Sequence, residues 1–225
     1  MTLLNCIICL ALGYLVGGIN PAYLISRAKG FDIRKKGSGN AGASNAVILM
    51  GKKIGVLVAF LDILKAYVIV SIASLLFPSL QQAKILTGMA CILGHVFPVF
   101  MNFRGGKGLA SLGGFILAYD WRVFVVMILS ELVFVLIVDY ICFVPITASA
   151  VFPIIYVIRD GDMIGAFLFL VITAVILYKH MENLHRIRKG TEAHFSYLWC
   201  KDKELERIKA KAGASDEEFN DTFHA

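Results

Sequence analysis

The sequence predicts an all-α polytopic membrane protein with about seven transmembrane helices, and three observations support this prediction. Of the 225 residues, 58% are hydrophobic and 17% are charged, and the mean hydropathy is +0.75. A soluble chain of this length needs more polar surface to cover its core. The apolar residues form blocks without the two-residue alternation of barrel strands, which favours helices. The basic residues gather in alternate connections between these blocks.

Seven apolar blocks are candidate membrane spans. The first two are long enough for the roughly 20 residues of a transmembrane helix. The other five are shorter, so some are expected to be half-spans or to extend through flanking polar residues. The shortest block, Leu109–Tyr119, is expected to be a short or re-entrant helix. In chain order the blocks are Leu3–Ile25, Ile54–Phe77, Ile85–Phe100, Leu109–Tyr119, Val123–Val138, Ile141–Ile158 and Met163–Tyr178.

The distribution of basic residues predicts the orientation of the chain. If the N-terminus lies outside and all seven blocks cross, the Lys and Arg residues of the connections divide 18 inside to 3 outside, with Lys65 inside the second block. This is the positive-inside pattern. It predicts that residues 26–53, residues 101–108 and the chain after Lys179 are cytoplasmic. The net charge of +6 is therefore interpreted as topology and contact with anionic lipid headgroups, and nucleic acid is not expected as a partner.

The cysteines and the start of the chain indicate no further chemistry. Four of the five cysteines lie in apolar blocks, and Cys200 lies near the C-terminus. Cys6 and Cys9 form a C-x-x-C pair, but a redox role needs an accessible thiol with a lowered pKa, so packing inside a helix is expected. No Lys or Arg precedes the first block, so a cleaved signal peptide is not expected.

One membrane-embedded domain is expected over residues 1–192, followed by a cytoplasmic tail over residues 193–225. Within the tail, Lys201–Lys211 has the charged composition of an exposed helix. Ala214–Ala225 is acidic and is expected to be frayed.

The first of three polar patches is the loop 37–45, with the sequence GSGNAGASN, which follows the basic residues 34–36. Glycines among small polar residues let the backbone turn so that its N–H groups converge, which suits a phosphate. The alternative interpretation is a flexible loop between two spans. The candidate phosphate-binding residues are Ser38, Gly39, Asn40, Gly42, Ser44 and Asn45.

The second patch is the segment 103–108, with the sequence FRGGKG, between two apolar blocks. Glycines that permit close backbone approach, followed by the start of a helix, form an anion site by geometry and dipole. Lys107 adds a full charge. The spacing is not that of a Walker A loop, and a positively charged turn is the alternative. The candidate anion-binding residues are Arg104, Gly105, Gly106, Lys107 and Gly108.

The third patch is the segment 180–192, with the sequence HMENLHRIRKGTE. If the last span continues as a helix, His180 and Asn183 share one face, and Gly190 ends the helix. His180 is a candidate proton acceptor or phosphate ligand. The alternative is a basic stretch that binds anionic lipid at the membrane surface. The histidine spacings match no zinc signature, so no metal is expected.

Ionisable residues also occur inside the apolar blocks. Asp62 and Lys65 are three residues apart on one helical face. Such residues are costly in a bilayer and usually face the interior of a helix bundle, so an internal ion pair is expected, with a role in substrate binding as the alternative. Glu131 and His95 are interpreted in the same way.

Four stretches carry a family resemblance. The patterns are GSGN-x-G-A-[ST]-N at 37–45, G-H-x-F-P-V-F at 94–100, F-x-G-G-K-G-x-A at 103–110 and H-x-x-N-x-x-R-x-x-x-G-T-E at 180–192. In this order and spacing they resemble the PlsY-type glycerol-3-phosphate acyltransferases of bacteria. The resemblance extends from about Gly13 to Glu192.

The resemblance implies an enzyme of the bacterial inner membrane that moves an acyl group from acyl phosphate to the 1-hydroxyl of glycerol-3-phosphate. The products are lysophosphatidate and inorganic phosphate, and no cofactor is implied. Beyond the two substrates and membrane lipid, no partner is predicted. Catalytic roles are expected for Ser38, Lys107, His180 and Asn183. Substrate or phosphate binding is expected for Gly39, Asn40, Gly42, Ser44, Asn45, Arg104, Gly105, Gly106, Gly108 and Glu192.

The sequence departs from the family pattern at two positions. The family's arginine, three residues after the last Asn of the first pattern, is replaced by Ile48, and Lys52 is no clear substitute. The family's serine ahead of the third pattern falls at Pro145, with Thr147 or Ser149 as possible replacements. These departures leave open a catalytically degenerate homologue that binds or regulates phosphorylated metabolites. A small transporter is a weaker alternative, because the polar residues gather at one face.

Overall fold

The computed structural model describes residues 3–80 and 82–212, and the regular structure of this part is entirely helical. Six helical segments within it are long and apolar enough to cross a membrane, and α6 (Leu109–Tyr119) is a shorter apolar helix. The predicted all-α membrane fold is confirmed, with α6 as the short element. The remaining helices are α1 (Leu3–Gly17), α2 (Pro21–Ala28), α3 (Ala43–Met50), α4 (Lys52–Leu76), α5 (Ala83–Val96), α7 (Trp121–Val138), α8 (Phe143–Asp160), α9 (Met163–Lys189) and α10 (Lys201–Ala212).

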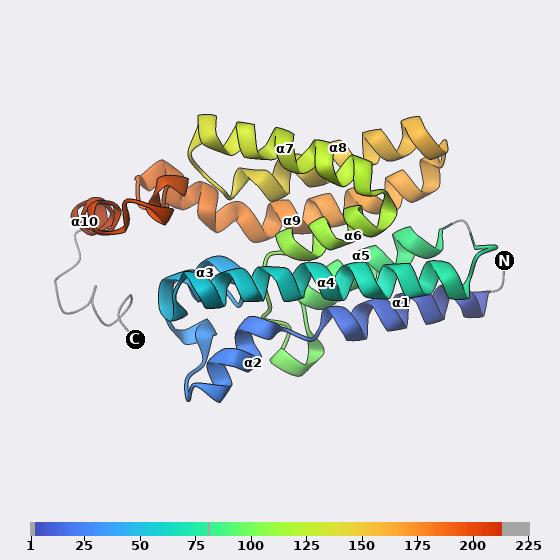
Figure 1. Cartoon of the computed structure of the whole chain (residues 1–225), viewed down its shortest axis with the longest axis horizontal. Helices are drawn as coiled ribbons and strands as arrows, with labels where there is room; N and C mark the ends of the chain where they lie inside the picture. Colours follow the sequence, from blue (N-terminus) through green and yellow to red (C-terminus); the bar gives the residue numbers. More distant parts are fainter. Residues whose placement is uncertain (1–2, 81, 213–225) are drawn as a thin grey trace.

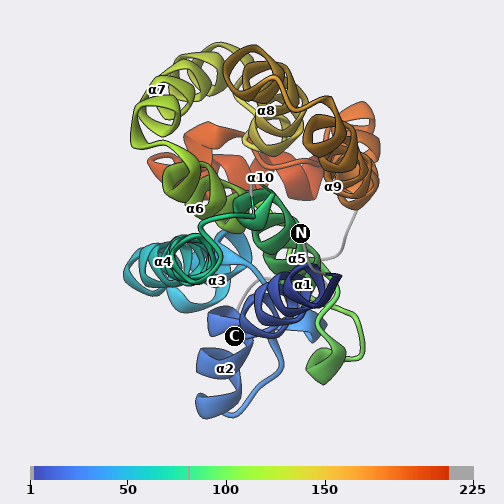
Figure 2. The same cartoon turned by 90° about the vertical axis from the view of Figure 1, so that its right-hand side faces the viewer.

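Two groups of helices lie side by side, with α6 between them (Figures 1 and 2). The first group holds α1, α4 and α5, and the second holds α7, α8 and α9. The short α6 packs against α4 and α5 on one side and against α7 and α8 on the other. It therefore joins the two groups through its own side chains.

Aromatic rings and glycines make this packing close. The ring of Phe115 on α6 lies 5.1 Å from that of Phe152 on α8 and 5.4 Å from that of Phe169 on α9. Glycines allow α1 and α5 to approach closely, since a methyl group on Gly17 would overlap the Cys91 carbonyl and one on Gly94 would overlap the Tyr14 carbonyl. Small residues at such crossings are typical of membrane helices.

Large apolar side chains cover much of the outside of the bundle. On α7, for example, Val126 and Ile137 are 67% and 77% exposed, and on α4 Leu75 is 80% exposed. We call these outward apolar side chains of the spanning helices the apolar belt. Hydrocarbon is the solvent that accepts such a surface without penalty, so the belt fits a membrane environment.

The first apolar block, Leu3–Ile25, lies within one candidate span, Leu3–Ala28, but this span consists of two helices rather than one. Helix α1 ends at Gly17, and α2 begins at Pro21. Asn20 caps α2 by accepting the amide of Tyr23 at 2.8 Å, and a proline in the first turn needs no partner for a missing N–H. The local sequence therefore stops one helix and starts another.

The other boundaries differ less from the predicted blocks. Helix α5 ends at Val96, before the predicted end of its block at Phe100. A 3₁₀ turn, Val99–Met101, follows it. A second such turn is Ile33–Lys35, and a third is Phe195–Leu198. Helix α9 continues past the apolar block to Lys189, as the third patch requires. The charged helix predicted in the tail is confirmed as α10, and the predicted frayed end, Ala214–Ala225, lies outside the described residues.

The connections alternate between the two ends of the bundle (Figure 1). The N-terminal start of α1 lies at the same end as the α4–α5, α6–α7 and α8–α9 connections. The α2–α4 segment, the α7–α8 connection and the chain after α9 lie at the opposite end. The basic residues of the α2–α4 segment and of the chain after α9 therefore lie at one end of the bundle, whereas the α5–α6 connection lies between the two ends in this view.

Candidate functional site

The third patch is built by the C-terminal end of α9. His180 and Asn183 are both buried, as their shared helical face predicts. Gly190 then stops the helix with φ +70°, and the amides of Thr191 and Glu192 turn back to the Arg186 carbonyl at 2.9 and 3.3 Å. Because of this turn, the Glu192 side chain lies against the last turns of α9.

Glu192 consequently joins two side chains of α9. Its Oε1 accepts a hydrogen bond from the Asn183 amide at 2.5 Å, and its Oε2 accepts from Nε of Arg186 at 2.7 Å. A carboxylate thus fixes the orientation of the Asn183 amide, whose nitrogen must face Glu192. The Asn183 oxygen is left to accept from another donor.

That donor is Lys107, so the second and third patches meet. The ammonium group of Lys107 donates to the Asn183 side-chain oxygen. Among the residues described, Lys107 has no carboxylate within ion-pair distance. Burial, and then the positive charge of Arg186, lower the pKa of Lys107 to about 8, against the opposite effects of Glu192 and Glu182. The result is a largely buried cation held by a neutral amide, which is a suitable receptor for an anion.

His180 is held in a form that can accept a proton. Its Nδ1 lies 2.8 Å from the carbonyl oxygen of Ile176. A carbonyl can only accept, so the hydrogen is assigned to Nδ1, and the lone pair is assigned to Nε2. The ring is buried in the same part of α9 as Asn183. These features are those of a general base or of a hydrogen-bond acceptor for a substrate hydroxyl.

The paired glycines of the second patch have a different role from the predicted amide cradle. The amides of Gly105 and Gly106 donate to the carbonyls of Val96 and His95 at 3.2 and 3.0 Å, so they are engaged at the end of α5. A methyl group on Gly106 would overlap the His95 ring. The two glycines therefore let the loop lie against α5, while Lys107 carries the charge.

The loop before these glycines has a strained backbone. Asn102 and Phe103 have φ values of +53° and +58°, a region that residues with side chains seldom adopt. Gly108, with φ +95°, ends the loop as the residue before α6. Strain of this kind persists where the surroundings fix the chain, and it is common at functional sites.

The predicted ion pair of α4 is confirmed, and His95 joins it beneath the second patch. Nζ of Lys65 lies 2.6 Å from Oδ1 of Asp62, and Nδ1 of His95 lies 3.2 Å from the same oxygen. The Lys65 ammonium also donates to the carbonyls of Gly17 and Ile19 at 2.9 and 2.6 Å. The cluster therefore connects the break between α1 and α2 to the ring on which Gly106 rests.

The first patch is a loop organised by Asn45. Its buried side-chain oxygen accepts from the Ser38 amide at 3.0 Å, and its nitrogen donates to the carbonyls of Ile33 and Lys36, both at 3.1 Å. Asn45 is therefore engaged within the loop rather than available as the predicted phosphate donor. A side chain on Gly37 would overlap the Asn45 oxygen, which explains why a glycine with φ +58° occupies that position.

Other members of the first patch remain accessible. Ser38, Gly39 and Ser44 are exposed, and Asn40 is half-buried. Gly42 is buried and precedes α3, whose first turn contains Ser44. The accessible hydroxyls and backbone near the start of α3 are the part of this loop that can contact a ligand.

Arg34 ties the first patch to the second. Its guanidinium donates to the Met101 carbonyl at 2.7 Å and forms a 2.7 Å ion pair with Asp32. The hydrogen bond from Arg34 lowers the Asp32 pKa to about 2. In the sequence, Arg34 is visible only as a basic neighbour of the loop. Its position three residues before the glycine-rich first patch is the feature of the sequence that could have indicated a structural role.

The positions that depart from the family pattern are also placed by the structure. Helix α3 begins at Ala43, so Ile48 lies in its second turn. Thr147 donates to both oxygens of Glu131 at 2.8 Å, and Ser149 donates to the Ile146 carbonyl at 3.1 Å. Both hydroxyls are therefore engaged within the α7–α8 pair.

One site residue, Cys142, was treated by sequence reasoning only as apolar filler. It immediately precedes α8, is buried, and lies near enough to Glu192, Lys107 and Arg186 for their charges to act on it. Burial, followed by the negative charge of Glu192, raises the thiol pKa to about 11. Cys142 is therefore a neutral, buried side chain in the neighbourhood of Lys107, three positions before Pro145.

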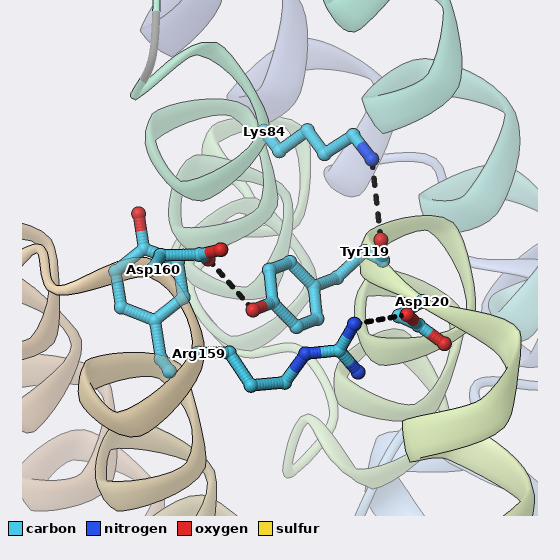
Figure 3. A pocket seen from close by; sticks show the side chains of 6 residues that line it. Lys84, Tyr119, Asp120, Arg159 and Asp160 are labelled. Carbon is cyan, nitrogen blue, oxygen red and sulfur yellow. Dashed lines mark hydrogen bonds and ion pairs between the residues drawn. The ribbon is translucent and has the colours of Figure 1, made fainter.

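A cavity of about 290 Å³ lies at the opposite end of the bundle (Figure 3). Its charged groups are mutually satisfied: Arg159 pairs with Asp120 at 2.6 Å, and the Tyr119 hydroxyl donates to Asp160 at 2.6 Å. Lys84 donates to the Tyr119 carbonyl at 3.2 Å. These contacts hold together the start of α5, the end of α6 and the end of α8. In the described ranges, no group of three metal-ligating side chains occurs.

Comparisons with known proteins agree with the patterns in the sequence. The family described as "Glycerol-3-phosphate acyltransferase" matches residues 7–190. A protein of that name from Aquifex aeolicus is 38% identical over 182 residues, which cover 81% of this chain and 95% of the relative. One from Lactiplantibacillus plantarum is 32% identical over 204 residues, which cover 89% of this chain and 98% of the relative.

Solved structures show the same fold. The crystal structure of PlsY (YgiH), an integral membrane glycerol 3-phosphate acyltransferase, in its glycerol 3-phosphate form has a TM-score of 0.79 and 36% sequence identity. The match covers 87% of this chain and 98% of that chain. Its lysophosphatidic acid form has a TM-score of 0.75, with 86% of this chain and 96% of that chain covered.

Proposed function

The chain belongs to the glycerol-3-phosphate acyltransferase family, and from this premise we propose that it transfers an acyl group to glycerol-3-phosphate, forming lysophosphatidate. The observation that carries the proposal is the meeting of Lys107, Asn183 and Glu192 at the end of α9. The three residues come from two of the family patterns, those at 103–110 and 180–192. A buried cation oriented by an amide and a carboxylate suits a reaction in which negative charge develops.

We propose acyl phosphate as the donor. An acyl phosphate is a mixed anhydride whose phosphate is a good leaving group, so the enzyme needs mainly to position the substrates and to neutralise charge. The glycerol-3-phosphate hydroxyl oxygen attacks the acyl carbon, the bond from that carbon to the phosphate oxygen breaks, and the hydroxyl proton passes to Nε2 of His180. The leaving phosphate takes up the negative charge beside Lys107. No covalent acyl-enzyme is needed.

The two phosphates are assigned to different patches. Lys107 and Arg104 are assigned to the phosphate of the donor, and Gly108 immediately precedes α6 beside them. The accessible part of the first patch, with Ser38 and Ser44, holds the phosphate of glycerol-3-phosphate, since exposed hydroxyls and amides near the start of α3 suit an anion.

An assay with purified protein tests the activity and the donor separately. The full chain in lipid vesicles is supplied with labelled glycerol-3-phosphate and, in turn, palmitoyl phosphate, palmitoyl-coenzyme A or a palmitoyl carrier-protein thioester. We expect lysophosphatidate and one equivalent of inorganic phosphate from palmitoyl phosphate alone. Product only from a thioester would contradict the donor assignment.

The catalytically degenerate homologue is the second candidate, and Ile48 is the observation that favours it. In that case glycerol-3-phosphate binds without forming product from any of the three donors. Binding measured by calorimetry, together with the absence of turnover, would replace the proposed activity by this one.

We propose that the protein lies in the bacterial inner membrane with the three patches and α10 on the cytoplasmic side. The support is the 18 to 3 division of basic residues and the alternation of the connections between the two ends of the bundle (Figure 1). The positive-inside rule then orients the end that carries the patches.

Cysteine labelling in intact cells tests this orientation. In a chain whose Cys6 and Cys200 are replaced by serine, Lys189→Cys and Asp160→Cys each place one thiol at an exposed position at opposite ends of the bundle. We expect a membrane-impermeant maleimide to label Asp160→Cys before lysis, and Lys189→Cys only after lysis. The reverse pattern would invert the proposed topology.

A further inference from the structure

We infer that Arg207 of the tail helix α10 is a positioning residue for the site, because it clamps the backbone on both sides of Thr191 and thereby fixes Glu192. Arg207 lies beyond residues 7–190, the segment that matches the family. For its role in turnover, the inference rests on the proposed function. The clamp itself can be measured without turnover.

The clamp consists of two short hydrogen bonds to main-chain oxygens. One terminal nitrogen of the Arg207 guanidinium donates to the Gly190 carbonyl at 2.6 Å, and the other donates to the Glu192 carbonyl at 2.6 Å. The planar guanidinium holds its donors in a rigid fork. The spacing between the two carbonyls is therefore set by the side chain that bridges them.

Glu204 holds the guanidinium in place from the other side. Its two carboxylate oxygens accept from Arg207 at 2.6 and 2.9 Å, and it also accepts the amide of His194 at 2.8 Å. The Glu204 side chain is buried. Ion pairs inside such a network are held in one geometry, in contrast to single pairs on the surface.

The segment leading to α10 is anchored at a second point. The Ser196 amide and hydroxyl donate to the two carboxylate oxygens of Asp139 at 3.0 and 3.2 Å, and the Phe195 amide donates to the Asp139 carbonyl at 2.7 Å. Asp139 belongs to the α7–α8 connection, and α10 lies at this end of the bundle (Figure 1). The described part of the tail is thus docked on the membrane domain.

The clamp acts on the site through Glu192. Glu192 orients Asn183, and Asn183 accepts the hydrogen bond of Lys107. Without Arg207 the carbonyls of Gly190 and Glu192 lose these donors, and the turn that returns Glu192 to α9 is left with its contacts to Arg186, Asn183 and the Ile187 carbonyl. Arg207 touches neither substrate in this arrangement, so its effect is one of position.

A matched pair of variants tests the inference in the full chain in lipid vesicles. Arg207→Gln removes the clamp, whereas Lys203→Gln makes the same change of charge at an exposed position of the same helix. We expect Arg207→Gln to lower kcat about tenfold, with KM for each substrate changed less than about threefold. Lys203→Gln should stay within about twofold of wild type. Arg207→Lys should recover part of the loss, because an ammonium can donate to the carbonyls but without the planar fork.

A double-variant cycle distinguishes positioning from a general weakening of the fold. In a Glu192→Ala background the clamp has no carboxylate to position, so Arg207→Gln should then cost less than about twofold. The same tenfold loss in both backgrounds would overturn the inference.

Hydrogen exchange supplies a readout that needs no turnover. Peptides that cover residues 190–197 should exchange faster in Arg207→Gln than in Lys203→Gln. If this occurs in a chain that does not catalyse acyl transfer, the clamp stands and the proposed function fails. If the wild type turns over and neither kcat nor exchange responds to Arg207→Gln, the proposed function stands and the clamp is overturned.

Discussion

Replacing Lys107 by methionine is expected to lower kcat by about a hundredfold, since one charged contact in a site of low dielectric contributes about 3 kcal/mol to the transition state. Methionine keeps the length and apolar stem of the side chain but cannot donate to Asn183 or, in the proposed reaction, neutralise the leaving phosphate. The chain should still fold and insert, because removing a largely buried charge also removes its desolvation cost. Steady-state kinetics in vesicles, with the thermal midpoint measured beside them, check both expectations.

The pH dependence gives a second test of the same residue. The Lys107 pKa is lowered to about 8, so the cation is present below this pH and is lost as the pH rises through it. We therefore expect kcat/KM to fall as the pH rises, with a midpoint near 8. The remaining activity of Lys107→Met should not show this alkaline decrease. Lys53→Met, which removes an exposed lysine of α4, is the control and should behave as the wild type. Near-normal turnover in Lys107→Met would mean that the second patch is a structural turn without a catalytic role.

Replacing Ile48 by arginine is expected to raise kcat/KM for glycerol-3-phosphate by roughly tenfold or more, mainly through a lower KM. A charge-assisted hydrogen bond to a phosphate is worth about 1.5–3 kcal/mol, and isoleucine has no donor. Position 48 lies in the second turn of the eight-residue α3 and is half-buried, so a long arginine side chain has to extend toward the exposed start of that helix. Kinetics against both substrates separate this gain from any effect on the acyl donor.

Ile48→Gln provides the matched control, because glutamine brings hydrogen-bond donors without the charge. If Ile48→Arg and Ile48→Gln are both inert, the site has changed as a whole, with Pro145 as the second sign. If the wild type binds glycerol-3-phosphate with ordinary affinity, another cation already binds the phosphate in place of the missing arginine.

The apolar blocks predicted the membrane helices because hydrocarbon demands long apolar segments with internally paired backbones. The break between α1 and α2 could also have been predicted, since Gly17-Gly18 and Asn20-Pro21 are ordinary signals for the end and the start of a helix. The short α6 was correctly anticipated from its length.

The site was predictable at the level of which patches carry charge. Lys107 and Asn183 are chemically conspicuous, and the family pattern places them in one site. The roles of Asn45, Gly105 and Gly106 were not predictable, because they depend on which carbonyls happen to lie beside them once α5 and the first loop have folded. The docking of α10 depends on contacts across more than 50 positions of sequence, such as Ser196 with Asp139, and no local pattern encodes these.

The apolar belt has a consequence for how the reaction is measured. The proposed donor, a long-chain acyl phosphate, partitions into the bilayer at about 0.8 kcal/mol per methylene, so under the proposed function the protein meets it by lateral diffusion within the membrane. Glycerol-3-phosphate arrives from the water. The relevant donor concentration is then a mole fraction of the lipid phase, and empty lipid added at constant total donor should lower the rate below saturation. A rate that is indifferent to added lipid would mean that the donor arrives from the aqueous phase.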